Sequence, residues 1–281
     1  MAKTISLINM KGGVGKSTLT VNLAWHFAAY RNWLKRVLVV DLDPQFNASQ
    51  YLVGVDGYKS ILDEGKPTIW DIFEENTKVP GAAPRTFDTN DAVTNVTTVE
   101  GGGRLDLIPS QLELALSLKG GPGSRERRLP RALKRLESDY DLILIDCAPT
   151  ESILTTSAYL SSDYILVPVK PEFLSTIGLP LLVNSMQDFK KEYEEHDLEL
   201  AGIVFNATTN YSPEESKSKR EVKELAKNNG WYVFKSELAY SRSYPKGARE
   251  GQPIFRTSYA RSDQASLFRA FAQEFAERIN L

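Results

Sequence analysis

Six short runs of almost entirely apolar residues are the clearest pattern in the chain. Each has the length of a buried β-strand rather than of a helix. Strands that are apolar throughout are typical of a parallel sheet that is covered on both faces. The six predicted strands are Thr4–Asn9, Val37–Asp41, Leu105–Pro109, Leu142–Asp146, Tyr164–Val169 and Leu200–Asn206.

Segments with apolar residues at helical spacing lie between and after these strands. They are Lys16–Tyr30, Thr68–Phe73, a helix through Leu129, Leu133 and Leu136, Val222–Asn228, and residues 261–280. Strands that alternate with helices predict an α/β fold, a doubly wound and mostly parallel sheet with helices on both faces. We expect a single domain over residues 1–281, with a less regular insertion at about residues 54–100.

Composition narrows the classes of protein that the chain can represent. Of its 281 residues, 42% are hydrophobic, which is enough for a large core, and the net charge is −2. Any nucleic-acid binding must therefore come from a local basic surface. The single cysteine, Cys147, excludes an internal disulfide and fits a cytoplasmic protein. No apolar stretch approaches the roughly 20 residues that span a bilayer.

The first predicted strand and helix are joined by the sequence NMKGGVGKST, from Asn9 to Thr18. A glycine-rich turn between a strand and a helix lets backbone N–H groups approach phosphates, and Lys16 adds a positive charge. Ser17 is placed to offer its hydroxyl to Mg²⁺. We therefore expect residues Lys11–Thr18, namely Lys11, Gly12, Gly13, Val14, Gly15, Lys16, Ser17 and Thr18, to bind a nucleotide.

This loop departs from the usual G-x-x-x-x-G-K-[ST] pattern, which would place a glycine where Met10 stands. Lys11 is an additional lysine beside that position. It is either a solvated loop residue or a second cation for phosphates. In the second case it projects outward, toward a nucleotide held by another subunit, in the manner of an arginine finger supplied in trans.

Acidic residues follow two of the predicted strands. Asp41 and Asp43 end one strand before Pro44, and Asp146 ends another. Carboxylates beside a phosphate loop can orient water or Mg²⁺. The alternatives are ordinary turn chemistry for the first pair and a helix cap for Asp146. Asn206 ends a later strand and is either a ligand contact or a turn residue.

Three motifs, in order, resemble those of the ParA/Soj partition ATPases, relatives of MinD with a deviant Walker A loop. They are KGGVGKST, DLDPQ (Asp41–Gln45) and LIDCAP (Leu144–Pro149). The resemblance continues through LIPSQLELAL, VPVKPEFLSTIGL and GQPI, and so covers nearly the whole chain. It implies a P-loop NTPase fold, ATP and Mg²⁺ as cofactors, and a homodimer that encloses two ATP molecules.

The resemblance also implies roles for individual residues. Lys11 would reach the partner subunit's phosphates, and Asp43 would position or activate the attacking water, with Asp41 in support. Asp146 would hold Mg²⁺, mostly through water, together with Ser17, and Asn206 would contact adenine. Two departures from the family pattern are Ala148, where proline is more common, and LAYSR at Leu238–Arg242, which replaces an Ile-Pro-Arg segment. The second weakens the transfer of an adenine-pocket proline and a DNA-contacting arginine.

Two groups of basic residues lie in the C-terminal third, where this family binds DNA without sequence specificity. Phosphate contacts of this kind weaken steeply with salt, and a dimer doubles their number. The alternative for each residue is a solvated helix face. The candidates are Lys217, Lys219, Arg220, Lys223, Arg242, Lys246 and Arg249.

These observations favour a cytoplasmic ATPase of the ParA type that associates with the nucleoid when ATP is bound. ATP-driven dimerisation would gate nonspecific binding of double-stranded DNA, and a ParB-like or cargo-bound partner would stimulate hydrolysis. No membrane anchor is expected. The alternatives are a membrane-associated regulator like MinD and a metabolic ATP-dependent enzyme of the same fold. The cargo is not specified by the sequence.

Overall fold

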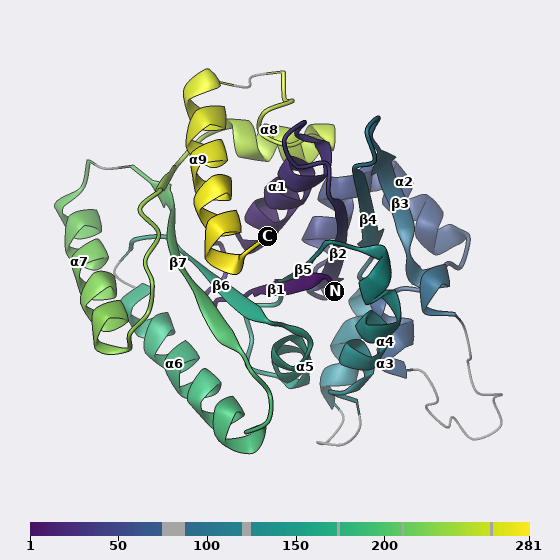
Figure 1. Ribbon diagram of the computed structural model, residues 1–281, viewed down its shortest axis with the longest axis horizontal. Helices are drawn as coiled ribbons and strands as arrows, with labels where there is room; N and C mark the ends of the chain where they lie inside the picture. Colours follow the sequence, from purple (N-terminus) through teal and green to yellow (C-terminus); the bar gives the residue numbers. More distant parts are fainter. Residues whose placement is uncertain (75–87, 120–124, 173–174, 210, 259–260) are drawn as a thin grey trace.

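The computed structural model describes residues 1–74, 88–119, 125–172, 175–209, 211–258 and 261–281 (Figure 1). Strands and helices alternate along most of this length. In chain order they are β1 (Lys3–Leu7), α1 (Lys16–Ala29), β2 (Arg36–Leu42), α2 (Asn47–Asp63), α3 (Ile69–Glu74), β3 (Thr94–Thr98), β4 (Arg104–Ile108), α4 (Arg128–Leu136), β5 (Leu142–Cys147), α5 (Ile153–Ser161), β6 (Tyr164–Val169), α6 (Ser175–Glu192), β7 (Glu199–Thr208), α7 (Pro213–Asn228), β8 (Leu238–Ala239), α8 (Ser243–Glu250) and α9 (Ser262–Ile279).

The described residues form one eight-stranded sheet in the order β3-β4-β2-β5-β1-β6-β7-β8. All neighbouring strands pair in parallel except β3, which runs antiparallel to β4. This confirms the expected doubly wound fold of a P-loop NTPase. Strand β1 lies between β5 and β6, so the connection from β5 to β6 passes over β1. Ligands of such sheets bind at this kind of switch point, beyond the carboxyl ends of the strands.

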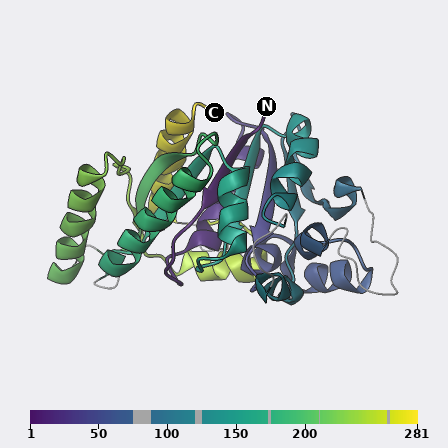
Figure 2. The ribbon, with the colours of Figure 1, turned by 90° about the horizontal axis from the view of Figure 1, so that it is seen from below.

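Helices cover both faces of the sheet, in two separate hydrophobic clusters. Helices α1, α2, α8 and α9 pack on one face and α3 to α7 on the other (Figures 1 and 2). Because alternate residues of each strand point to opposite faces, β2 contributes Val37 and Val39 to the first cluster and Leu38 and Val40 to the second. This burial on both faces explains why the strands are apolar throughout.

The described part of the region from 54 to 100 is more regular than its composition suggests. Helix α2 continues to Asp63 through one non-helical residue, Gly54, because Tyr58 and Ile61 are buried and hold its second half against the body of the protein. The short helix expected at Thr68–Phe73 is present as α3. The edge strand β3 follows. Residues 75–87 of the expected insertion lie outside the described part of the chain.

Candidate functional site

The glycine-rich loop connects the carboxyl end of β1 to the first turn of α1. Gly13 and Gly15 adopt positive φ angles of 74° and 90°, which a side chain would disfavour. Gly15 is the N-cap of α1, so no side chain occupies the hydrogen-bonding groups at the start of the helix. The amide groups and positive end of the α1 dipole therefore face the loop and can bind an anion.

Two asparagine side chains hold this loop in place. Asn9 Nδ2 donates to Pro168 O at the end of β6 (2.8 Å), and Asn9 Oδ1 accepts from the amide of Lys11 (2.9 Å). Asn206 Nδ2, from β7, donates to Val14 O (2.8 Å). Through this bond the amide nitrogen of Asn206 holds the loop backbone, and the contact of Asn206 with adenine stays a prediction. Asn9 was not anticipated, although an Asx-type bond to the residue two positions on is a recognisable feature of turns.

The two loop lysines make different contacts. Lys16 is buried, and its Nζ donates to the carbonyl oxygens of Asn9 (3.1 Å) and Lys11 (3.2 Å). Burial lowers the pKa of Lys16, and the nearby Asp146 carboxylate opposes this shift. Lys11 has a different partner: its Nζ forms an ion pair of 2.9 Å with Glu172, which follows β6. The side chain of Lys11 is 21% exposed and that of Glu172 is 44% exposed.

The predicted acidic residues gather at the same edge of the sheet. Asp41 pairs in register with Asp146 on the neighbouring strand, and Asp43 follows β2. Burial raises the pKa of Asp41 to about 7, although hydrogen bonds from Ser49 oppose the shift. Burial, and then the Asp41 charge, raises the pKa of Asp146 well above its usual range. Burial thus favours the neutral form of both carboxylates.

Asp41 is engaged in positioning the chain that follows β2. Its Oδ2 accepts from the amide (2.8 Å) and hydroxyl (2.7 Å) of Ser49, and its Oδ1 accepts from the amide of Asp43 (3.2 Å). Ser49 Oγ in turn accepts from the amide of Ser110, beyond β4 (3.0 Å). Asp43 Oδ1 accepts from the amide of Gln45 (2.9 Å), and 7% of Asp43 is exposed.

Asp146 is a buried carboxylate with few hydrogen-bond partners. It is fully buried, and its Oδ1 lies 3.5 Å from Thr20 Oγ1. A hydrogen bond from Ser17 acts against the rise in its pKa, while Oδ2 has no hydrogen-bond partner among the described residues. A buried carboxylate oxygen without a partner is costly unless an ion or water binds it. The hydroxyl and carboxylate oxygens present here suit Mg²⁺.

The remaining loop positions complete this geometry. Val14 is buried, whereas Gly12 and Gly13 are exposed and a side chain at either would meet no other atom within 4 Å. Thr18 lies in the first turn of α1, where its carbonyl oxygen accepts from Asn22 Nδ2 (2.7 Å). Gly12 and Gly13 are therefore open to solvent.

The basic candidates in the C-terminal third lie in two separate places. One set is on α7, at the β7 side of the molecule, and the other is on and beside α8, against α2 (Figures 1 and 2). Of the α7 set, Lys219 forms ion pairs with Glu215 (3.1 Å) and Glu237 (2.6 Å) and exposes 13% of its side chain. These contacts make Lys219 a poor phosphate ligand. The exposed basic candidates are Lys217, Arg220, Lys223, Arg242 and Arg249, with Lys246 half-buried beside Glu250.

Comparisons with known proteins agree with this geometry. A family model described as an AAA domain matches residues 2–200. The chain is 33% identical to the sporulation initiation inhibitor protein Soj of Bacillus subtilis, over 98% of this chain and 99% of that protein. Among solved structures, a variant of McdA from Cyanothece in complex with ATP has a TM-score of 0.79 at 18% identity and covers 100% of this chain and 97% of its own.

A metabolic enzyme has a similar fold. Cobyrinic acid a,c-diamide synthase from Mycobacterium smegmatis, with bound ADP and magnesium, has a TM-score of 0.70 at 22% identity and covers 97% of this chain and 93% of its own. At these identities the two solved structures establish only the fold. The fold and the loop together define a P-loop nucleotide-binding protein. The match to Soj over nearly the whole of both chains is more specific, and the chain belongs to the ParA/Soj family of partition ATPases.

Proposed function

We propose that the chain binds ATP and Mg²⁺ at the loop between β1 and α1 and hydrolyses the ATP. The backbone of Gly12–Thr18 and the Lys16 ammonium would hold the phosphates, and Ser17 and Asp146 would hold Mg²⁺. The bound ion supplies neutralisation of phosphate charge. The observation that carries this proposal is Asp146 Oδ2, a buried and unpartnered carboxylate oxygen beside Lys16.

Asp43 is the proposed group for the attacking water. It lies just after β2, with its backbone fixed by Asp41 and one of its oxygens holding the Gln45 amide. This leaves the other carboxylate oxygen, Oδ2, to accept a hydrogen bond from water. Asp41 is a positioning residue, because its hydrogen bonds reach Ser49 and the backbone of Asp43.

Lys11 is the proposed link between two subunits. Its ion pair with Glu172 holds it beside its own loop. A partially exposed ion pair is worth no more than about 1 kcal/mol, so a more highly charged triphosphate on a second subunit can displace Glu172. ATP would then favour a homodimer in which each Lys11 serves the other subunit's nucleotide.

Replacement of Lys11 tests this proposal directly. We expect Lys11→Ala to retain ATP binding, because Lys16 is unchanged, and to lose ATP-dependent dimerisation measured by light scattering. Lys3→Ala is the matched control and should dimerise normally. It removes a lysine at the start of β1, at the end of the strands opposite to the loop. An unchanged ATP dimer in Lys11→Ala would refute the role of Lys11 between subunits.

The proposed output of the dimer is nonspecific binding of double-stranded DNA, released when a ParB-like or cargo-bound partner stimulates hydrolysis. The exposed arginines and lysines on α7 and near α8 support it. In this function the ATP-bound protein would be associated with the nucleoid in the cytoplasm. The cargo can be a plasmid, a chromosome or another large assembly.

The last helix bears on the competing proposal of membrane binding. Phe268, Phe271, Phe275 and Ile279 of α9 are fully buried against the sheet, so this face is not available to a lipid surface. In the described part of the chain, no helix has the length and apolar character required to cross a bilayer. DNA is therefore the better supported target of the ATP-bound form.

A further inference from the structure

The GQPI motif, Gly251–Ile254, has no role in the nucleotide site described above. It comes directly after α8. Gly251 has a positive φ of 62° and ends this helix, and the amide of Gln252 donates to Gly247 O (2.9 Å). The chain then returns to the core at Ile254, which is fully buried. The motif therefore fixes how α8 ends and where the following segment enters the protein.

Asn22 of α1 joins this segment to the phosphate loop. Its Oδ1 accepts from the amide of Ile254 (2.7 Å), and its Nδ2 donates to Thr18 O (2.7 Å) and to Tyr51 Oη (3.2 Å). Because a backbone amide only donates and a carbonyl oxygen only accepts, these partners fix the orientation of the Asn22 side chain. Asn22 is fully buried. One side chain thus connects the first turn of α1, helix α2 and the segment after α8.

Tyr51 makes a second contact with α8. A Cβ at Gly247 would lie 2.9 Å from Tyr51 Oη, so the middle of α8 packs directly on this hydroxyl. Burial raises the pKa of Tyr51 to about 12, so the hydroxyl is neutral at pH 7. Helix α8 carries Lys246 and Arg249, two of the basic candidates. It is therefore held at its middle and beyond its end by groups that meet at Asn22.

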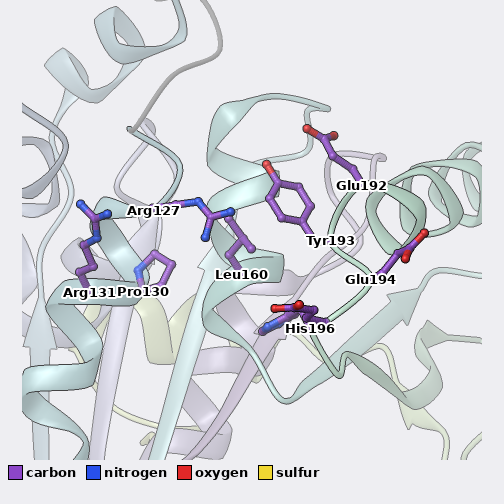
Figure 3. Close-up of a pocket in the computed structure, with 9 residues that line it drawn as sticks. Arg127, Pro130, Arg131, Leu160, Glu192, Tyr193, Glu194 and His196 are labelled. Carbon is purple, nitrogen blue, oxygen red and sulfur yellow. The ribbon is translucent and has the colours of Figure 1, made fainter.

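The cleft on the opposite face of the sheet does not reach the phosphate loop. It has a volume of about 450 Å³ and lies between α4, the end of α5 and the segment after α6 (Figure 3). The Arg127 guanidinium lies 5.6 Å from the centre of the Tyr193 ring, and His196 Nε2 lies 2.8 Å from Tyr159 O. The residues that line this cleft are all described, and none belongs to Lys11–Thr18. The contacts of Asn22, in contrast, lead from that loop to α8.

We propose that Asn22 is a positioning residue that transmits the state of the phosphate loop to α8 within one subunit. Phosphates bound at the loop would shift the first turn of α1 and with it Thr18 O, the acceptor of Asn22. The Asn22 amide would follow, and Ile254 and α8 would follow it, because a buried network with every partner in place moves as a unit.

This proposal rests on the proposed function, in which the loop binds ATP and α8 contributes to DNA binding. It adds a connection that acts before two subunits meet. Dimerisation changes only the number of phosphate contacts, whereas Asn22 would change the position of the basic residues in each subunit.

The first test follows α8 in a single subunit. Lys11→Ala is the background, because it is expected to bind ATP without dimerising, and light scattering sets the protein concentration at which subunits are single. Cys147 is the only cysteine and is buried, so Pro245→Cys places one accessible thiol for an environment-sensitive dye on α8. We expect ATP with Mg²⁺ to change the dye fluorescence, with the same saturation as ATP binding measured by equilibrium dialysis. Binding of ATP without a change in fluorescence would overturn the proposal.

Variants of the network show whether Asn22 carries this response. Asn22→Ala should still bind ATP and should reduce the response about fivefold or more, and Tyr51→Phe, which removes only a hydroxyl, about twofold or more. Tyr51→Phe decides the question if Asn22→Ala does not fold. Tyr58→Phe is the matched control, because it removes a buried hydroxyl of the same helix whose bond goes to Ser110 O instead (2.9 Å). A full response in Asn22→Ala, or equal losses in the two tyrosine variants, would overturn the role of Asn22.

Hydrogen exchange without nucleotide separates this inference from the function on which it rests. In Asn22→Ala, the amides of Gly247 and Ile254 should exchange about tenfold faster or more, while those of α7 should be unchanged. Unchanged exchange at Gly247 would overturn the positioning of α8 and leave the ATPase intact. If the wild type does not bind ATP, the proposed function fails, and exchange alone decides whether Asn22 positions α8.

Discussion

At the scale of single residues, Gly15 is the most constrained position of the loop. Its φ is 90°, and a Cβ there would lie 2.3 Å from Asn206 Nδ2, the atom that holds Val14. We expect Gly15→Ala to lower the free energy of unfolding by about 1–3 kcal/mol, because backbone strain adds to this clash. Urea unfolding measures the change. Gly12→Ala meets open space and should cost less than about 1 kcal/mol, so equal losses would contradict this account.

Asp43 gives a second prediction at this scale. Asp43→Ala removes the proposed water-positioning carboxylate but leaves Lys16, Ser17 and Asp146 in place. We expect this variant to bind ATP, to hydrolyse it at least tenfold more slowly, and to accumulate as a DNA-bound dimer. Single-turnover hydrolysis and DNA co-sedimentation measure the two effects. Rapid turnover would remove Asp43 from the mechanism.

At the scale of elements, a buried histidine lies where α1 packs against α9. His26 is buried, stacks on Tyr30 with ring centres 5.1 Å apart, and contacts Phe268. Burial, and then the charge of Arg269, lowers the pKa of His26 to about 4 from its usual 6.5. The unfolded chain therefore binds a proton more readily than the folded chain between these two values.

The sign of the resulting pH dependence follows from linkage. The contribution of neutral His26 to the free energy of unfolding is fully present above pH 6.5. It decreases as pH falls and is lost by about pH 4, which lowers the free energy of unfolding by up to about 3 kcal/mol. We expect His26→Phe to reduce this acid-dependent loss of stability. Denaturant unfolding at several pH values measures it. Parallel stability curves for the variant and the wild type would show that His26 is not responsible.

The elements show which parts of the fold could be predicted from the sequence. Strands β2 and β5 were predictable because residues buried on both faces leave no polar interruption in VLVVD and LILID. Helix α6 was not, because Gly178 and Pro180 interrupt its apolar pattern. Helix α2 was missed for a similar reason at Gly54, although tertiary contacts carry the helix past it.

The candidate site also has parts that the sequence could predict and parts that it could not. The glycine loop and Asp146 belong to motifs that are continuous in the chain, so they could be recognised from the sequence. Glu172 contacts Lys11 from 161 positions away and Asn206 contacts Val14 from 192 positions away. Only the sheet order brings such pairs together, and no local pattern shows which atom of a side chain is engaged. The sequence could therefore predict a nucleotide site but not the ion pair that holds Lys11.

At the scale of the whole molecule, the two basic sets face different directions from one sheet. We expect nonspecific DNA binding to require ATP and to weaken steeply with salt, because dimerisation doubles the number of phosphate contacts. A titration of DNA with ATP, with ADP and without nucleotide, over a range of salt, measures this. Absence of DNA binding at every salt concentration would exclude a partition function of this type.

Individual basic residues refine this prediction. Because Arg249 is exposed, Arg249→Ala should reduce the salt slope of DNA binding by about one for each phosphate that this arginine neutralises. Lys219→Ala should instead lower thermal stability, because it removes the cation that is paired with the buried Glu215. A larger effect of Lys219 than of Arg249 on DNA affinity would reverse this assignment.

The two border strands of the sheet, β3 and β8, affect whether copies of the chain can aggregate. Strand β8 has only two residues, and the pairing of β3 with β4 is irregular between Asn95 and Thr97. Short or bulged border strands are poor templates for adding another strand, which guards against aggregation. In the proposed function, many copies of the protein bind close together on DNA. Because both border strands are poor templates, these copies have little capacity to form fibres through their sheets. Reversible contact between two copies can then be confined to the face that carries the proposed nucleotide site.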